Sequence, residues 1–242
     1  MEPRYLYKYM SGLDRIGDIA VNRRIFFSSP LNFNDPYDCA VGVRFSDSKN
    51  ITINKSDIQR KTDLLIQEYG KNFGVFCVSE TMESVAMWAH YAANHRGVII
   101  EFDYAALVNL HANIRHFRVD YAESFPTFSD HKDLVDQLGE PKDNDKFIKL
   151  FFCRKSIEWD KEREWRFFTT PCDSYQDLTD SAITRIIFGT KMPETNKHLI
   201  QKWVQGDLDN IILSDAILSN ADFKIIAEDR IQTGDHKSPN KP

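Results

Sequence analysis

The chain has 242 residues, of which 42% are hydrophobic and 12% aromatic, and its formal net charge is −5 at pH 7. This length and apolar content suffice for a sizeable core, which excludes an intrinsically disordered chain. The negative balance excludes the overall basic surface that dedicated duplex-binding proteins present. The four cysteines are dispersed, which predicts reduced thiols and argues against a zinc site.

The first residues lack the apolar core of a signal sequence, and no apolar run is long enough to cross a bilayer. Together with the dispersed cysteines, this predicts a soluble, cytoplasmic protein without membrane association.

Apolar periodicity and turn-forming residues divide the chain into strands and helices. The predicted strands span residues 5–10, 24–29, 74–79, 98–102, 117–121, 159–170, 183–188, 211–213 and 223–226. The predicted helices span residues 11–22, 56–69, 87–93, 105–114, 130–138, 145–156 and 193–204. No internal repeat or linker separates these elements. We therefore expect an α+β fold, in which one domain (residues 1–232) has a mixed, mainly antiparallel sheet flanked by helices. Residues 233–242 are polar and are expected to form a disordered tail.

The loop after the second strand is rich in turn-forming residues. Asn34, Asp35 and Pro36 favour an Asx-type turn. We expect Asn34, Asp35 and Asp38 to be mainly structural, holding the loop through hydrogen bonds from backbone N–H groups to their side chains. Asp35 and Asp38 could also bind a metal, but the sequence gives no ordered third ligand, and we expect no metal site.

The segment from Trp159 to Arg166 concentrates charge beside two indole rings. On an extended strand Glu162 and Glu164 would point to the same side, because side chains alternate between faces. A salt-bridged edge strand and a functional site explain this pattern equally well.

A second candidate segment precedes the strand predicted over residues 98–102. Trp88 and Tyr91 fit a helix face that packs in the core, with His95 and Arg96 as a solvated cap. Alternatively, His90 or Tyr91 lines a pocket that binds a planar ring. In the first strand, Lys8 could contact a phosphate, or the strand could be ordinary half-buried packing. No Gly-rich phosphate loop and no G-x-S-x-G sequence is present, which argues against those nucleotide-binding and hydrolase classes.

Four segments together resemble a bacterial family catalogued as domain of unknown function 2971 (DUF2971). The resemblance extends over about residues 5–230 and supplies no activity by itself. The segments that carry it are residues 5–9, 27–38, 87–97 and 159–166.

The order of a first strand with a ring or cation, a second strand that ends in Ser28 and a late strand with Glu resembles ADP-ribosyltransferase-like folds. This resemblance implies NAD as the substrate, cleavage of its nicotinamide–ribose bond, and transfer of ADP-ribose to a protein or nucleic acid, possible settings being anti-phage defence and toxin systems. Glu162-Arg163-Glu164 would match the E-x-E element of those enzymes, and Ser28-Ser29 their strand serine. Lys8 departs from the Arg or His common in their first strand.

The implied roles follow the chemistry of glycosidic cleavage, which builds positive charge on the ribose. Glu164 would stabilise that charge and Glu162 would orient the acceptor. The cofactor-binding residues implied are Tyr7 or Tyr91 stacking on nicotinamide, Lys8 or Arg96 contacting the pyrophosphate, and Ser28 and His90 lining the site. Two alternatives remain, namely a non-catalytic defence module that binds nucleic acid or a phage component, and a scaffold in which these motifs are structural. Convergence of the candidate residues on one cleft would favour the enzyme.

Overall fold

The computed structural model of the protein describes residues 2–35, 37–38, 44–45, 60, 63–64, 67–68, 70–129, 131–138, 144–205 and 210–230. The tail predicted over residues 233–242 and most of the helix predicted over residues 56–69 lie outside the described residues.

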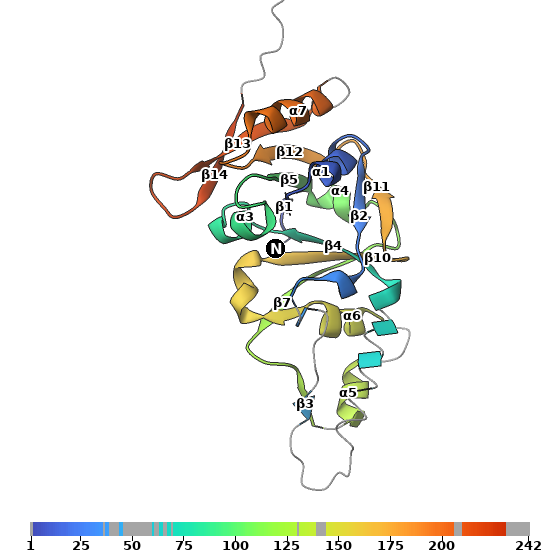
Figure 1. Cartoon of the computed structure of the whole chain (residues 1–242). Helices are drawn as coiled ribbons and strands as arrows, with labels where there is room; N and C mark the ends of the chain where they lie inside the picture. The colour runs from blue at the N-terminus through green and yellow to red at the C-terminus, as the bar shows by residue number, and fades with distance from the viewer. Residues whose placement is uncertain are drawn as a thin grey trace, which may run out of the picture.

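In the described part of the chain, eight strands form one mixed sheet in the order β14-β13-β12-β5-β1-β4-β10-β6. All neighbouring pairs are antiparallel except β12 and β13, which are parallel. Figure 1 shows most of this order from top to bottom. The strands are β1 (Tyr5–Met10), β4 (Gly74–Ser79), β5 (Val98–Asp103), β6 (Arg115–Arg118), β10 (Glu164–Thr169), β12 (Ile183–Phe188), β13 (Ile212–Leu218) and β14 (Ile225–Asp229).

Short strands form three additional pairs among the described residues. β2 (Arg24–Phe27) pairs with β11 (Ser174–Asp177) in antiparallel fashion. The other two pairs are parallel and join β3 (Arg44–Phe45) to β8 (Thr127–Phe128) and β7 (Asp120–Ala122) to β9 (Arg154–Ser156).

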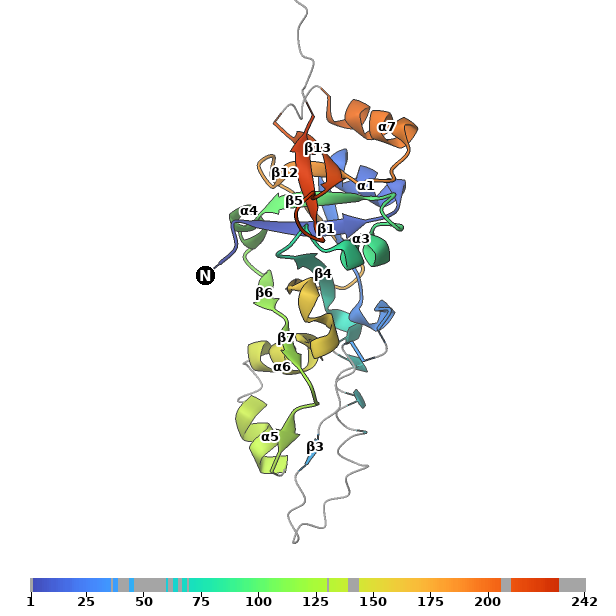
Figure 2. The same ribbon diagram turned by 90° about the vertical axis from the view of Figure 1, so that its left-hand side faces the viewer.

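Helices cover both faces of the sheet, as Figures 1 and 2 show. They are α1 (Leu13–Ala20), α3 (Val85–Tyr91), α4 (Tyr104–Val108), α5 (His131–Leu138), α6 (Asn144–Phe152) and α7 (Glu194–Val204), with 3-10 helices η1 (Pro30–Asn32) and η2 (Ile157–Glu162). Because side chains alternate along strands, Leu6 and Met10 of β1 face the core shared with α1, α4 and α7, whereas Tyr9 packs against Trp88 of α3. The predicted α+β fold with a mixed, mainly antiparallel sheet is confirmed.

Two predicted elements differ from the structure near the candidate glutamates. The helix predicted over residues 145–156 ends at Phe152, because the next residues pair with β7 and form β9. Residues 157–162 form η2 and not a strand, since the Ser156 hydroxyl accepts the Glu158 N–H and starts the 3-10 turn.

The sheet opens between β1 and β4. Tyr7 opposite Ser79 is the register pair that joins these two strands, whereas β1 pairs with β5 and β4 pairs with β10 over six residues each. The Lys8 ammonium crosses the opening and donates to the Cys77 carbonyl oxygen at 2.7 Å. A strand edge that faces its neighbour without pairing leaves polar backbone groups available, and here it forms one wall of a cavity.

Candidate functional site

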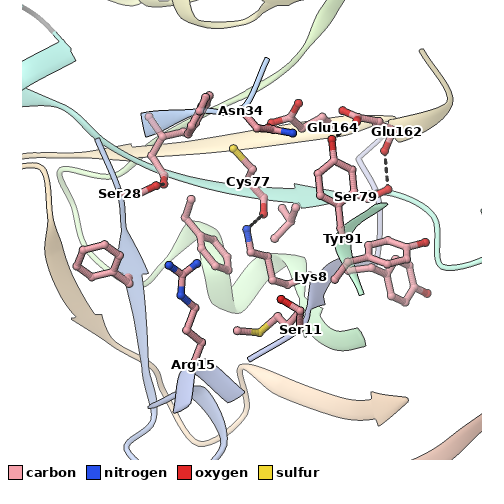
Figure 3. Close-up of a pocket in the computed structure, with 18 of the residues that line it drawn as sticks. Lys8, Ser11, Arg15, Ser28, Asn34, Cys77, Ser79, Tyr91, Glu162 and Glu164 are labelled. Atoms are coloured by element: carbon pink, nitrogen blue, oxygen red, sulfur yellow. Dashed lines mark hydrogen bonds between the residues drawn. The ribbon is translucent and has the colours of Figure 1, made fainter. Parts of the chain in front are cut away.

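A cavity of about 580 Å³ occupies the opening between β1 and β4. This volume lies in the range of small-molecule sites, about 300–1,000 Å³. Its walls come from β1, β2, β4, one face of α1, the loop around η1, and α3, and the strand β10 contributes Glu164. Figure 3 shows Lys8 between the group of Glu162, Glu164 and Tyr91 and the side chain of Arg15.

Five side chains form a buried ion cluster at one end of the cavity: Asp38, Lys155, Glu162, Glu164 and Arg166. Lys155 Nζ lies 2.7 Å from Glu162 Oε2, 3.3 Å from Glu164 Oε2 and 3.4 Å from Asp38 Oδ2. Arg166 donates from Nε to Glu164 Oε1 at 2.8 Å and from Nη2 to Asp38 Oδ2 at 2.8 Å. Three carboxylates and two cations meet here, so the five groups carry one excess negative charge.

Local backbone geometry brings the two glutamates together. Glu162 ends η2, and Arg163 adopts a left-handed conformation with φ 45° before β10 begins at Glu164. Glu164 and Arg166 then share one face of β10, because they are two residues apart on a strand. The predicted shared orientation of Glu162 and Glu164 is therefore present, but the strand that was expected to produce it is wrong at Glu162.

The cations of the buried ion cluster keep Glu164 ionised. Although burial alone raises the pKa of a carboxyl group, Arg166 and Lys155 lower the pKa of Glu164 to about 2. Burial also opposes the charge on Lys155, but the Glu164, Asp38 and Glu162 carboxylates raise its pKa above the ordinary value. At neutral pH Glu164 can therefore accept hydrogen bonds or stabilise positive charge, but it cannot donate a proton.

Two tyrosines make further polar contacts with the cluster. The Tyr91 hydroxyl donates to Glu162 Oε1 at 2.7 Å, and the Tyr121 hydroxyl accepts the Glu164 N–H at 2.9 Å. Burial is the largest cause that raises the pKa of Tyr91, and the Glu162 carboxylate raises it further. The Tyr91 hydroxyl therefore remains a donor at neutral pH. Trp159 covers the cluster, with its ring centroid 5.2 Å from Lys155 Nζ.

Lys8 is the cation in the middle of the cavity. In the described part of the chain, no ion pair joins Lys8 to a carboxylate, and its ammonium lies 5.0 Å from the centroid of the Phe76 ring. Burial lowers the pKa of Lys8, whereas it raises the pKa of the neighbouring Cys77 thiol. A negatively charged ligand in the cavity would favour the charged form of Lys8, which burial opposes, whereas the Cys77 thiol stays protonated and poorly nucleophilic at neutral pH.

A row of polar residues crosses the sheet in register and passes along the cavity. Arg185 of β12 lies opposite Glu101 of β5, which lies opposite Tyr7 of β1; Tyr7 lies opposite Ser79 of β4, and Ser79 lies opposite Glu164 of β10. Burial, together with the smaller effect of the Glu101 carboxylate, raises the pKa of Tyr7 to about 12. This row fixes Tyr7 and Glu164 on the same face of the sheet.

The cavity brings together most of the residues singled out from the sequence. Its lining includes Tyr7, Lys8, Ser28, His90, Tyr91, Glu162 and Glu164. Arg96 does not line it, because it lies in the tight turn after α3, in which residues 93–95 have positive φ angles. The expected contact of Arg96 with a pyrophosphate is therefore wrong for this cavity.

The structure agrees with some of the other expectations about single residues and differs from others. Trp88 is fully buried and is a core anchor, as the structural alternative predicted. Asp35 accepts the Tyr37 N–H at 2.9 Å, which is the expected loop contact. Asp38 is expected to be mainly structural and to hold the loop through backbone hydrogen bonds, whereas its carboxylate pairs with Arg166 and Lys155.

Sequence reasoning missed several residues that the structure places here. The sequence pattern places Lys155 in a helix and does not single out Arg15, Phe26 or Tyr175, yet all four line the cavity. One usable signal is the alternation along β2 between residues that face the cavity and residues that face the core. Arg24, Phe26 and Ser28 share one face, and Ile25 and Phe27 are buried on the other.

Comparison with known protein families gives a match over part of the chain. Residues 87–167 match the family described as protein of unknown function (DUF2971). This is about a third of the chain and narrower than the expected extent of residues 5–230. No curated protein and no solved structure matches.

The DUF2971 match runs from α3 through β10. It contains four of the five members of the buried ion cluster, all except Asp38, and it also contains Tyr91. Lys8 and the β2 wall lie outside it. The matched segment therefore supplies the acidic end of the cavity.

Two features are absent from the described residues. Among the described residues, no group of three or more His, Cys, Asp or Glu side chains is arranged to hold a metal ion. The helices in that same part include none with the length and apolar character needed to span a membrane.

Proposed function

We propose that the cavity is the active site of an enzyme that cleaves the nicotinamide–ribose bond of NAD and transfers ADP-ribose to a macromolecular acceptor. The observation that carries the proposal is the convergence of Glu162, Glu164, Tyr7, Lys8 and Tyr91 on one cavity, although they come from three separate segments of the chain.

The charge state of Glu164 supports this reaction. Departure of nicotinamide leaves positive charge on the ribose, and a carboxylate held in a water-poor site stabilises such charge. Glu164 is ionised because Arg166 and Lys155 hold its pKa at about 2, and the cluster retains one excess negative charge at the cavity wall.

The remaining lining residues supply complementary contacts. Tyr91 and Tyr7 present aromatic rings near the carboxylates, which suits a planar nicotinamide. Lys8 presents an ammonium without a carboxylate partner among the described residues, which suits a phosphate. Glu162 is oriented by Tyr91 and Lys155, so it is positioned to hold an acceptor or a ribose hydroxyl.

The test is release of nicotinamide from NAD by the wild-type protein, by Glu164→Gln and by the control Asp215→Asn. Asp215 is a carboxylate paired with two cations outside the cavity. We expect Glu164→Gln to lower turnover by about 100-fold or more, since lost transition-state electrostatics cost roughly 3–4 kcal/mol. Asp215→Asn should retain wild-type turnover.

Thermal melting on the same proteins separates chemistry from folding. A wild-type protein that releases no nicotinamide with any protein or nucleic acid acceptor contradicts the proposal. Binding of nucleic acid without NAD turnover would instead favour a non-catalytic binding module.

A further inference from the structure

Two partly exposed aromatic rings line the cavity where β2 pairs with β11. Phe26 of β2 and Tyr175 of β11 lie opposite each other in the strand pairing, with ring centroids 5.0 Å apart. Both line the cavity, and they are 39% and 43% exposed. Neighbouring Ile25 and Phe27 point the other way into the core, so burial of apolar surface within this chain does not account for Phe26 and Tyr175.

Polar contacts hold this aromatic rim in place. The Arg24 guanidinium lies 4.0 Å from the centroid of the Tyr175 ring and is fixed by Asp18, with Nη2 donating to Oδ1 at 2.7 Å. The Tyr175 hydroxyl donates to the other oxygen of Asp18 at 2.9 Å. The rim is thus arranged before any ligand arrives, which reduces the entropy lost on binding.

Arg15 connects the rim with the centre of the cavity. It lies on α1, lines the cavity and is exposed, and no ion pair in the described part of the chain involves it. Its positive charge acts on both Lys8 and Tyr175, and it opposes protonation of Lys8. Arg15 therefore lies near both residues, and neither Arg15 nor Lys8 forms an ion pair with a carboxylate of the described residues.

The cavity therefore has three chemically distinct parts in sequence. The first part is the aromatic rim of Phe26, Tyr175 and Arg24, of which Tyr175 lies near Arg15. Figure 3 shows Lys8 between Arg15 and the pair of Glu164 and Tyr91. This is the order of a planar base, a phosphate group and a second ribose with its ring.

We propose that the aromatic rim stacks a nucleobase, so that the adenine half of a dinucleotide binds at Phe26 and Tyr175, its phosphates at Arg15 and Lys8. The identity of the second half rests on the proposed function, whereas binding of an adenine nucleotide at the rim does not. Aromatic rings beside arginine are the usual means by which proteins stack bases without reading their sequence.

The test is calorimetric titration of the full chain with AMP, ADP-ribose and nicotinamide mononucleotide. Four variants are compared with wild type: Tyr175→Leu, Phe26→Leu, Tyr175→Phe, and the control Phe223→Ala, which removes a fully exposed ring outside the cavity. We expect Tyr175→Leu and Phe26→Leu each to weaken the binding of AMP and of ADP-ribose by about tenfold, which is the usual effect of removing one stacking ring. Nicotinamide mononucleotide should bind unchanged.

Tyr175→Phe keeps the ring and should retain AMP affinity, which distinguishes stacking from loss of the Asp18 contact. Retained melting temperature is required of each leucine variant, and Phe26→Leu serves if Tyr175→Leu does not fold. Failure of wild type to bind AMP at millimolar concentration overturns the inference, as does AMP affinity that is equal in both leucine variants and wild type. Loss of transfer to an acceptor with unchanged nucleotide affinity would assign the rim to the acceptor and also overturn it.

The outcomes separate this inference from the proposed function. AMP binding that depends on Tyr175, without any NAD cleavage, supports the rim and contradicts the transferase. NAD cleavage with a KM that is unchanged in both leucine variants supports the transferase and contradicts the rim.

Discussion

Two groups of charged side chains in this molecule have similar composition and different surroundings. The buried ion cluster contains three carboxylates and two cations. The second group, here the edge network, contains Glu194, Lys197, Asp215 and Arg230, where α7 meets β13. Both groups have ion pairs as short as 2.7 Å. The side chains of the edge network are 12–63% exposed, whereas Arg166 is fully buried.

The difference indicates what each group is for. Solvent screens the edge network, its charges balance, and pairs of this kind contribute little to stability. The buried ion cluster bears a large desolvation cost that apolar residues would avoid, and it keeps one excess negative charge. Stability alone does not explain such a cluster beside a cavity, which is why we assign it a function.

The largest expected effect comes from Arg166→Met. This change removes the Arg166 guanidinium, which pairs with Glu164 and Asp38 in the interior. It also removes the donor to the Phe152 carbonyl oxygen. We expect the free energy of unfolding to fall by about 3–5 kcal/mol, as for other broken buried pairs. Urea denaturation measures it, and a loss below about 1 kcal/mol would show that the cluster is not the tightly coupled unit described above.

The pH dependence of stability provides the next test. The pKa of Glu164 is about 2 in the folded protein, against 4.5 for an unperturbed glutamate side chain, so its folded value is depressed. Its contribution is therefore present above pH 4.5 and is lost as pH falls toward 2, and by linkage it amounts to about 3 kcal/mol. Urea denaturation between about pH 5 and pH 2 should show a shallower loss for Glu164→Gln than for wild type. Equal slopes would contradict the ion pairing.

A smaller effect is expected for Tyr91→Phe, which removes only the hydroxyl that donates to Glu162. Hydrogen bonds to charged groups contribute about 1.5–3 kcal/mol, and Tyr91 is only partly buried, so we expect a loss of about 2 kcal/mol. If the variant is as stable as wild type, the Tyr91 hydroxyl does not orient Glu162.

The smallest effect is expected in the edge network, for Arg230→Met. Methionine keeps much of the packing near Phe188 and removes the ion pair with Asp215. We expect a loss of about 1 kcal/mol or less in the same urea experiment, because the pair is partly exposed. A loss equal to that of Arg166→Met would remove the distinction between the two groups.

Much of the sheet could be predicted because apolar strands bounded by turn residues are local signals. β1, β4, β5 and β12 lie where their periodicity placed them. The sequence pattern therefore places Tyr7 and Lys8 in the correct element. Their meeting with Tyr91 and Glu164 depends on the order of strands in the sheet, which the pattern does not give.

The contacts of the buried ion cluster could not be predicted in the same way. Lys155 lies within the helix predicted over residues 145–156, which contains the buried residues Phe151 and Phe152. Residues 154–156 form a strand only because they pair with β7. The left-handed backbone at Arg163 has no sequence signal, since glycine is the residue that usually marks it. Asp38 meets Arg166 across 128 positions of sequence, a contact that only the tertiary fold creates.

The measurement that tests the central claim most directly is calorimetric titration of the wild-type protein and Lys8→Met with NAD. Lys8 is the cation at the centre of the cavity, and it is not part of the buried ion cluster, so its loss should affect binding more than folding. We predict saturable binding of one NAD per chain to wild type, weakened by about tenfold in Lys8→Met, as expected for a lost charge-assisted hydrogen bond. Absence of saturable binding to a folded wild-type protein at millimolar NAD, or equal affinity in the two proteins, would contradict the account.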